Sequence, residues 1–313
     1  DLRHALARLG MLREDVENDL GAGDHPAMEG LLEVALLARR HLAVDEPLRI
    51  AWLVYRGNPH CGGQGVYTRY VAREVAALGH HIEVLSGQPW PQLDDPAQLV
   101  EVPGLDLYRQ PDPFRVPHMR EFRDSVDVRE FGIMCAAGFP EPWAFSERAR
   151  RILRDRRDDF DLVHDNQCLG IGLLELQRLV PLATTIHHPI TRDFRVALDA
   201  VPPWNLYRRF NLWRWFNSFL PMQVEVARGL ERVLTISHAS TRDIIADFGI
   251  ESSRCRMVSN GINLEVFQPK PEIARERDRL ITTLSADVPL KGVSYLLEAL
   301  AEAEGGITLT EVA

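Results

Sequence analysis

A glycine-rich turn is the part of the sequence best suited to chemistry. It lies in the segment YRGNPHCGGQG, where Gly62, Gly63 and Gly65 stand between an apolar run and a helix-like stretch. Backbone amides at such a turn, together with the positive end of the following helix dipole, can bind a phosphate group. The turn therefore predicts a phosphorylated ligand, although glycines at this spacing can also form a tight strand-to-helix turn that binds nothing.

Two common kinds of phosphate site do not match this turn. A dinucleotide site needs the pattern G-x-G-x-x-G and an acidic residue at the end of the second strand. Here Thr68 stands where the third glycine belongs, and Glu83 lies inside the second predicted strand rather than at its tip. A P-loop needs G-K-[ST] after the glycines, and no such sequence follows. The amides of the turn are therefore expected to face a single diphosphate.

The elements that must position this turn alternate between strand-like and helix-like from Arg49 onward, which predicts a parallel sheet covered on both faces. The predicted strands are residues 49–55, 81–86, 98–102, 161–165, 182–187, 232–236 and 255–258. The first helix, about 63–78, ends at Gly79, a residue suited to a helix C-terminus. Open α/β sheets bind ligands at the carboxyl ends of their strands, so residues at those ends are the candidate site.

The chain is predicted to contain a helical extension, one complete domain and the start of another. Residues 1–45 form the extension, and residues 46–268 form a Rossmann-like domain. A charged, proline-bearing linker over residues 269–278 leads to a second Rossmann-like α/β domain at residues 279–313, inside which the sequence ends, so we expect a fragment. Residues 103–145, rich in proline and aromatic residues, are predicted to be an irregular insertion.

Composition excludes several classes of protein. With 313 residues, 45% hydrophobic and 26% charged, the chain has the composition of a soluble globular protein. The net charge of -9 argues against a general nucleic-acid surface, although a local basic patch is still open. The sequence has no apolar run long enough to span a membrane, and its cysteines show no C-x-x-C spacing, so we expect a cytoplasmic protein without a metal site or a disulfide framework.

Five motifs follow the glycine turn in a fixed order, namely DFDLVHDNQCLG, ATTIHHP, RVLTISHASTRDIIADFGI, VSNGINLEVFQP and PLKG. Together they closely resemble the retaining glycosyltransferases of family 4, in an actinobacterial-type branch, from about Arg49 to the end of the chain. The resemblance implies the GT-B architecture of two facing Rossmann-like domains. It also implies a nucleotide-diphosphate sugar as donor substrate, a hydroxyl of a glycan, lipid or small molecule as acceptor, and neither a metal ion nor a cofactor.

The resemblance assigns the residues that meet the sugars. His187, at the end of LATTIH, matches the family histidine that contacts the transferred sugar near the reacting carbon, so it is the predicted catalytic residue. The neighbouring His188 fits that pattern less well, and His164 is predicted to be structural. Asn166 and Gln167 follow the fourth strand and are predicted to contact the acceptor or the sugar.

The resemblance also assigns the donor side. Lys291, in PLKG, matches the lysine that binds the donor phosphate, opposite the amides of the glycine turn. Asn260 and Gly261 match an Asn-Gly turn that borders the donor pocket, although the same pair can form a plain turn. The family usually has an arginine five residues before the lysine, and here Ala286 stands there. The strength of the phosphate site is therefore open.

Two alternative functions and one expectation about activity accompany this interpretation. A pair of glutamates expected later in the second domain is absent from the sequence, so we expect the chain alone to transfer no measurable sugar. A GT-B sugar-nucleotide epimerase and a noncatalytic nucleotide-sugar binding module are the competing functions. The sequence indicates neither the sugar nor the oligomeric state.

Two further segments have a structural and a functional interpretation. Trp204–Met222 is dense in aromatic residues and arginines, which suits either a peripheral contact with the inner face of a membrane or a helix packed on the sheet. Ser237 is predicted to be a helix N-cap rather than a catalytic serine.

Overall fold

The computed structural model describes residues 46–60, 63–264, 266–274, 276, 279–282, 292–302 and 308–311. The predicted helical extension at residues 1–45 therefore lies outside the described residues, as do Gly62, Ala286 and Lys291. The described chain falls into two compact units. The first contains the described part of Asp1–Pro189 together with Arg214–Asn260, and the second contains Ile190–Trp213 and the described part of Gly261–Ala313.

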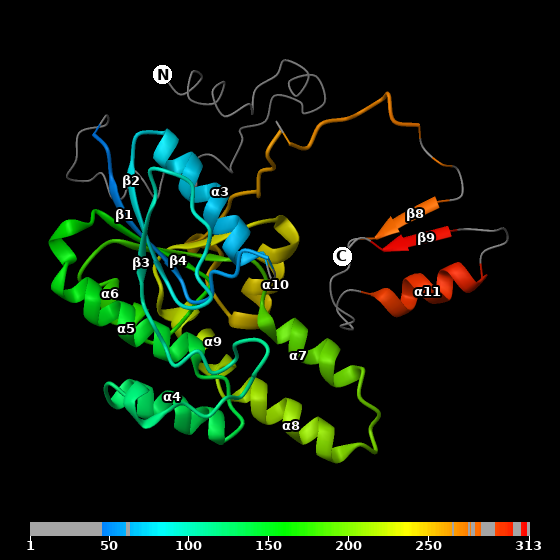
Figure 1. Cartoon of the computed structure of the whole chain (residues 1–313), viewed down its shortest axis with the longest axis horizontal. Coiled ribbons are helices and arrows are strands. Elements are labelled where there is room, and N and C mark those ends of the chain that lie inside the picture. Colours follow the sequence, from blue (N-terminus) through cyan, green and yellow to red (C-terminus); the bar gives the residue numbers. More distant parts are fainter. Residues whose placement is uncertain are drawn as a thin grey trace. The chain divides into compact units, whose positions relative to one another are not determined.

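A seven-stranded sheet, parallel throughout, forms the centre of the first unit, with the strand order β3-β2-β1-β4-β5-β6-β7 (Figure 1). Its strands are β1 (Arg49–Val54), β2 (His81–Ser86), β3 (Gln98–Glu101), β4 (Leu162–Asn166), β5 (Leu182–Ile186), β6 (Val233–Thr235) and β7 (Cys255–Met257). All seven strands predicted from the sequence are confirmed, to within one residue at each end. Side chains that alternate along β1 supply both faces, because Ile50 and Trp52 join one cluster and Ala51 and Leu53 the other.

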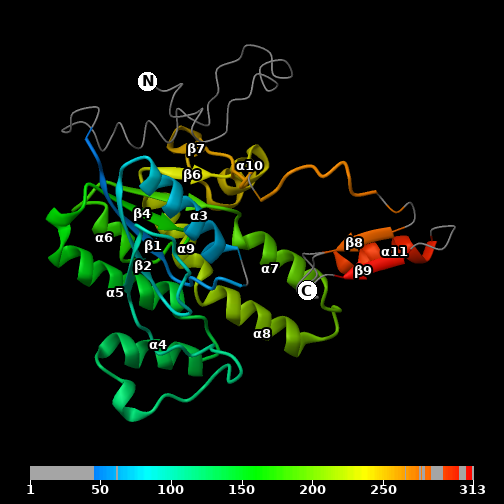
Figure 2. The ribbon, with the colours of Figure 1, turned by 45° about the horizontal axis from the view of Figure 1, so that its top comes forward.

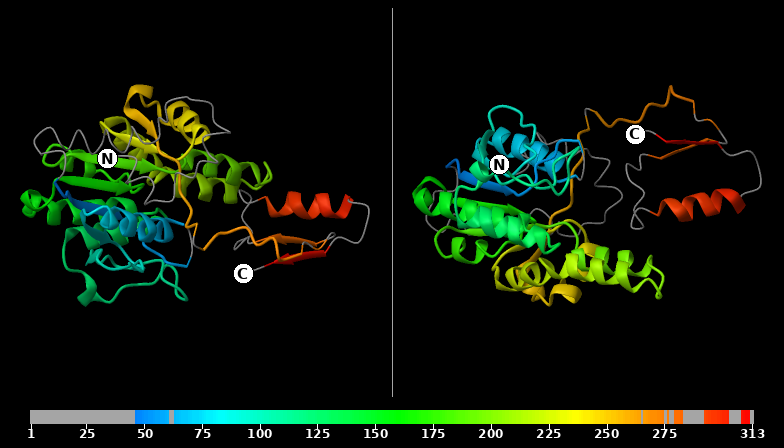
Figure 3. Two further views of the ribbon diagram at one scale, coloured as in Figure 1. Left: turned by 90° about the horizontal axis from the view of Figure 1, so that it is seen from above. Right: turned by 60° about the horizontal axis from the view of Figure 1, so that its bottom comes forward.

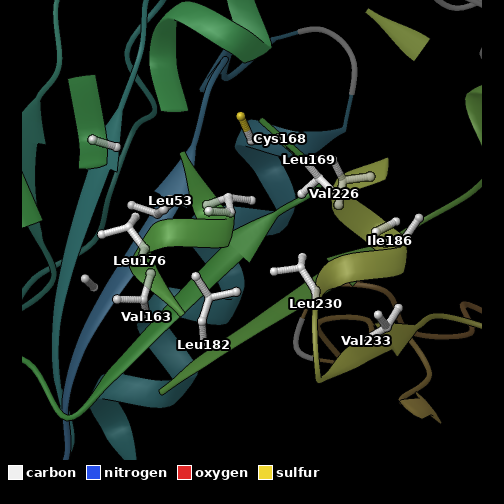
Figure 4. Close-up of a cluster of buried hydrophobic side chains, with 14 of the residues drawn as sticks. Leu53, Val163, Cys168, Leu169, Leu176, Leu182, Ile186, Val226, Leu230 and Val233 are labelled. Carbon is white, nitrogen blue, oxygen red and sulfur yellow. The ribbon is translucent and has the colours of Figure 1, made fainter. Parts of the chain in front are cut away.

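Helices cover the two faces of this sheet. The helices of the first unit are α3 (Gln64–Ala77), α4 (Ser125–Cys135), α5 (Glu141–Asp155), α6 (Leu173–Leu176), α9 (Leu220–Gly229) and α10 (His238–Phe248). Helix α3 packs on one face, whereas α5, α6, α9 and α10 pack on the other (Figure 3). Figure 4 shows the larger of the two cores, where Leu53, Val163, Leu182 and Val233 of the strands meet Val226 of α9.

The expectation of an irregular insertion at residues 103–145 is wrong in part. Helix α4 lies within this segment. Asp124 caps the start of the helix by accepting hydrogen bonds from the amides of Val126 and Asp127. Helix α5 begins at Glu141, with a proline in its first turn. A short 3-10 helix, η3 (Met119–Glu121), is the other regular element of this segment. Figure 1 and Figure 2 show α4 beside α5, on the side of α5 away from the sheet.

Buried ion pairs join these two helices. Arg148 of α5 is 11% exposed and donates to Asp127 at 2.5 Å and to Glu130, both of which lie on α4 and are almost fully buried. Arg123 adds a second cation on Asp127. Burial opposes ionisation of Asp127, but the hydrogen bonds from the two arginines outweigh it and lower its pKa to about 2. The packing of α4 on α5 therefore depends on Arg148, which compensates the buried carboxylates of Asp127 and Glu130.

The second unit contains two helices before the linker and a small sheet after it. Its elements are α7 (Ile190–Asp199), the beginning of α8 (Leu206–Asn217), β8 (Arg279–Thr282), α11 (Val293–Glu302) and β9 (Thr308–Glu311). Strands β8 and β9 are parallel and α11 lies between them in sequence, which makes a β-α-β unit. A seven-stranded parallel sheet together with a separate β-α-β unit confirms the predicted α/β fold class, whereas the exact domain boundaries stay a prediction.

The aromatic stretch Trp204–Met222 is not one helix, because α8 ends at Asn217 and α9 begins at Leu220. Arg209 caps the end of α7 by donating to the carbonyls of Leu198 and Val201, each at 2.9 Å. Trp215, near the end of α8, packs in a cluster with Tyr108 and other aromatic residues of the first unit. The stretch therefore contains both structural side chains and exposed ones.

Candidate functional site

The glycine turn opens helix α3 at the carboxyl end of β1. Gly63 is the N-cap, with a left-handed φ of 75° that other residues rarely adopt, and no side chain caps this helix end. At Gly65 a Cβ would lie 2.3 Å from the carbonyl oxygen of Gly57 and 2.2 Å from that of Asn58. Glycine is therefore required at position 65 so that the two stretches of backbone can approach each other.

His187 follows β5, at the same carboxyl edge of the sheet. Its Nε2 lies 2.7 Å from Oδ1 of Asn166, the last residue of β4, and Tyr67 of α3 packs edge-on against its ring at 4.8 Å. Burial, and then the nearby His188, lower the pKa of His187 to about 4. The ring is therefore neutral near pH 7, and it acts in hydrogen bonds rather than as a cation.

Asn166 and Gln167 are both buried, and their polar atoms bond to the protein. The Oε1 of Gln167 accepts a hydrogen bond from the amide of His187 at 2.6 Å, and its Nε2 donates to the carbonyl of His188 at 2.8 Å. Gln167 has a φ of 52°, so the backbone is in the left-handed region where it leaves β4. Their predicted contact with acceptor or sugar stays a prediction, and in the structure both side chains hold the end of β5.

A contact between Asn166 and the glycine turn brings these elements together. The Nδ2 of Asn166 donates to the carbonyl of Gln64 at 3.4 Å and to the hydroxyl of Thr68 at 3.1 Å. Gln64 stands between Gly63 and Gly65, so the turn, the end of β4 and His187 form one connected site. Three of the candidate elements predicted from the sequence are therefore adjacent.

Sequence reasoning missed three residues of this site, namely Trp52, Tyr67 and Thr68. Thr68 is fully buried and accepts a hydrogen bond from the indole of Trp52 at 3.2 Å. Thr68 stands where the third glycine of the dinucleotide pattern belongs, and this mismatch is the sequence feature that could have identified it as a site residue. Tyr67 precedes it on α3, and burial raises its pKa against an opposing hydrogen bond with Thr185.

His164 and Ser237 lie where the sequence predicts structural residues. His164 is buried, stacks on Trp52 with ring centroids 4.1 Å apart, and lies with Nε2 2.9 Å from the hydroxyl of Thr185. Burial, and then His187, lower its pKa to about 3. The structural interpretation of His164 is therefore confirmed. Ser237 is the N-cap of α10, accepting from the amide of Ser240 at 3.1 Å, which confirms its predicted role.

An arginine that the sequence did not single out lies at the same edge of the sheet. Arg56 follows β1 and donates to Glu141, the first residue of α5, at 3.2 Å. Burial raises the pKa of Glu141 to about 7, and Arg56 opposes this effect only in part. Arg56 therefore supplies a cation near the carboxyl end of β1.

The remaining donor-side candidates are less defined. Asn260 and Gly261 are exposed and lie at the boundary between the two units, Asn260 in the first and Gly261 in the second. In the part of the chain that the structure describes, no three His, Cys, Asp or Glu side chains form a group that could hold a metal ion. No helix within the described residues has the length and apolarity needed to cross a bilayer.

Comparison with known proteins agrees with the motifs. Residues 61–266 match the model of Glycosyltransferase Family 4. The MMP alpha-(1->4)-mannosyltransferase of Mycolicibacterium hassiacum is 51% identical over 256 residues, which cover 81% of this chain and 61% of that protein. The D-inositol 3-phosphate glycosyltransferase of Kribbella flavida is 23% identical over 279 residues, covering 83% of this chain and 59% of that protein.

The solved structures with similar folds include Anabaena Alr3699/HepE in complex with UDP and glucose. Its TM-score is 0.47 at 14% identity, over 84% of this chain and 60% of that one. The chain thus spans about three fifths of the length of the curated relatives that it matches. Because the family model covers well over half of the sequence, the resemblance inferred from the motifs is confirmed. The chain belongs to glycosyltransferase family 4.

Proposed function

We propose that this chain provides the acceptor-side domain of a retaining glycosyltransferase, which moves a sugar from a nucleotide-diphosphate sugar to an acceptor hydroxyl. The observation that carries the proposal is the connected site at the carboxyl edge, where the neutral ring of His187 joins through Asn166 to the glycine turn. Family membership and the 51% identity to a mannosyltransferase support mannose as the transferred sugar.

The proposed chemistry follows from the charge that develops during transfer. As the bond between sugar and phosphate breaks, negative charge grows on the departing diphosphate, and preorganised positive groups stabilise that charge. The amide end of α3, at Gly63 and Gly65, would supply such groups from the first unit. Lys291 would supply an ammonium from the second domain, and Asn260 with Gly261 would border the donor pocket. On this mechanism transfer needs no metal ion, so we expect it to continue in the presence of a chelator.

His187 has a different part in the proposal. A neutral imidazole cannot balance the charge of a diphosphate, but it can accept or donate a hydrogen bond to a sugar hydroxyl. Its position at the end of β5 suits that contact, since ligands of open α/β sheets bind at this edge. In this proposal the amides and Lys291 stabilise the charge on the diphosphate, and His187 orients the sugar.

An assay of the complete gene product tests the proposal. Nucleotide sugars, with GDP-, UDP- and ADP-linked donors compared, are incubated with a panel of acceptors, and the anomeric configuration of the product is read by NMR. Retention of configuration, with a fall of about 5-fold in kcat/KM for His187→Ala, the equivalent of one hydrogen bond between neutral groups, and little change for His188→Ala, supports it. An inverted product overturns the retaining mechanism. Epimerisation of the donor without transfer indicates the epimerase, and binding without turnover indicates the noncatalytic module.

We further propose that α8 contacts the inner face of a membrane from the cytoplasm. Trp204, Tyr207, Phe210 and Trp213 are 80%, 80%, 54% and 51% exposed. These aromatic side chains accompany Arg208, and no acidic residue lies between Trp204 and Met222. Aromatic rings next to cations suit the interface of an anionic bilayer.

Flotation with liposomes that contain phosphatidylserine tests this contact. Tyr207→Ser with Trp213→Ser should reduce the bound fraction several-fold. Met119→Ser, which alters an apolar residue on η3 that is 80% exposed, as Tyr207 is, is the control. Trp215 is left in place because it packs against Tyr108. Equal binding by all forms, or binding by none, contradicts the membrane contact.

A further inference from the structure

The hydrogen bonds around Asn166 fix the orientation of its side-chain amide. Its Nδ2 lies 3.4 Å from the carbonyl oxygen of Gln64, which can only accept a hydrogen bond. Turning the amide by 180° would bring its oxygen against that carbonyl, and the two acceptors would repel each other. The nitrogen of Asn166 therefore faces Gln64, and the oxygen faces His187.

Trp52 extends the same network at its other end. Its indole nitrogen can only donate, so the hydroxyl oxygen of Thr68 accepts that hydrogen bond at 3.2 Å. The same hydroxyl oxygen accepts from Nδ2 of Asn166 at 3.1 Å. Asn166 is fully buried, and the carbonyl of Gln64, which cannot donate, is the partner that fixes the orientation of its amide.

This orientation determines which nitrogen of His187 carries the proton. The Oδ1 of Asn166 is an acceptor 2.7 Å from Nε2 of His187, so Nε2 must donate. Burial lowers the pKa of the ring to about 4, with His188 as the second cause, so the ring carries a single proton near neutral pH. That proton is on Nε2, and Nδ1 is left with its lone pair as an acceptor.

Gln167 holds the backbone that carries the ring. Its side-chain amide bonds to the amide of His187 and to the carbonyl of His188, so it continues the pairing of β4 with β5 beyond the last strand residue. Tyr67 then limits rotation of the ring, since its own ring lies edge-on at 89°. Asn166 and Gln167 thus restrain the imidazole and the main chain of His187 separately.

We propose that Asn166 is a positioning residue that holds His187 as the Nε2–H tautomer, so that Nδ1 accepts a hydrogen bond from a hydroxyl of the sugar substrate. The second half of this inference rests on the proposed function, whereas the tautomer itself does not. The specificity that follows is chemical: the group opposite Nδ1 must be a donor, and a hydroxyl satisfies this where an ether or a deoxy position cannot.

NMR of the chain tests the tautomer directly. Two-bond correlations between the ring protons and nitrogens of ¹⁵N-histidine distinguish a protonated ring nitrogen from an unprotonated one, and His187→Gln identifies the signals of this residue. At pH 7 we expect Nε2 to be protonated and Nδ1 to be unprotonated. A ring with the proton on Nδ1, or a positively charged ring, would overturn the proposal.

Variants of Asn166 test the cause. Asn166→Leu removes the acceptor, so the ratio of Nε2–H to Nδ1–H should fall by at least about 5-fold, the population equivalent of one net hydrogen bond. Asn166→Asp places a carboxylate beside Nε2 and should raise the pKa of His187 by about 1 to 3. The wild-type spectrum and Asn166→Asp keep the test decisive if Asn166→Leu does not fold. Gln177→Leu, which removes a side chain that clamps Gly229 and Glu231 instead, is the matched control and should leave the ring unchanged.

The outcomes separate this inference from the proposed function. An unchanged tautomer ratio in Asn166→Leu would overturn the role of Asn166, whatever the activity of the enzyme. A complete gene product that transfers no sugar but shows the Nε2–H ring would overturn the proposed function and support the assignment of the tautomer. A deoxy analogue of the sugar that reacts as well as the parent at every position would overturn the contact with Nδ1.

Discussion

The variant Glu141→Gln should become more stable relative to the wild type as the pH rises from acid to alkaline. Glu141 begins α5 and accepts one hydrogen bond from Arg56 at 3.2 Å. Burial raises its pKa to about 7, Arg56 opposes that rise, and Glu130 and Asp106 add to it. The structure therefore makes this an ion pair in which the cost of burying the carboxylate exceeds the attraction of its partner.

The sign follows from proton binding. An ordinary glutamate has a pKa of 4.5, so between pH 4.5 and about 7 the folded protein binds more protons at this position than the unfolded chain. The free energy of unfolding therefore falls as the pH rises through that window. Between pH 5 and pH 8 the wild type should lose about 2.5 kcal/mol from this carboxyl alone. Glutamine has no proton to lose and keeps an oxygen toward Arg56, so Glu141→Gln should lack this loss.

Urea unfolding at pH 5 and pH 8, followed by tryptophan fluorescence, measures the difference between variant and wild type. That difference should move in favour of the variant by about 2.5 kcal/mol between the two pH values. Asp94→Asn is the control, because Arg69 lowers the pKa of Asp94 below its ordinary 3.8, and a carboxyl with a lowered pKa changes stability only at more acid pH. A difference that is equal at the two pH values, or that moves against the variant, would show that Arg56 keeps Glu141 ionised and would refute the reasoning.

Three further changes test the packing around the sheet. Gly65→Ala should destabilise the protein by roughly 1–3 kcal/mol, since its Cβ would meet backbone oxygens. Gly132→Ala should stabilise the protein, because position 132 lies in a helix with open space around a Cβ. Thermal unfolding of both variants measures the difference, and equal effects would contradict it. Ser237→Ala should cost about 1 kcal/mol in urea unfolding through loss of the cap, and an unchanged stability would contradict the capping role. Arg148→Met should lower the free energy of unfolding by roughly 3–5 kcal/mol, because it removes the cation that pairs with two buried carboxylates. Arg151→Met, which removes a surface ion pair, should lower it by less than about 1 kcal/mol. Similar urea midpoints for the two variants would contradict that ranking.

The order of strands and helices could be predicted because each element is encoded by residues that are close together in the sequence. The central strands β1, β4, β5 and β6 are buried along almost their whole length. Buried strands appear in the sequence as short, mostly apolar runs bounded by polar or turn residues, as RIAWLV and LATTI do. The carboxyl edge followed from the parallel arrangement alone, and it correctly indicated the neighbourhood of His187. Helix α4 was missed because prolines and aromatic residues surround it, while its own signal, the cap at Asp124, is a single residue.

The contacts within the site could not be predicted, because they join residues that are far apart in the sequence. Asn166 bonds to Thr68 across 98 residues, and Gln167 bonds to His187 across 20. The types and positions of Asn166 and Gln167 indicated a polar role at the edge of the sheet. Only the fold shows that their polar atoms meet His187, because that depends on how β4 and β5 pair.

A neutral, restrained histidine has a consequence for how catalysis would be divided within the site. Removing one hydrogen bond to a neutral group changes a free energy by about 1 kcal/mol, whereas removing a donor that faces developing charge changes it by roughly 3–4 kcal/mol. His187 cannot carry charge near pH 7, since its pKa is about 4. On the proposed function, the larger share of transition-state stabilisation would therefore come from groups around the diphosphate, while His187 would orient the sugar. The close approach at Gly65 would matter for this division, because a side chain there would meet the carbonyl oxygens of Gly57 and Asn58 and displace the amide end of α3.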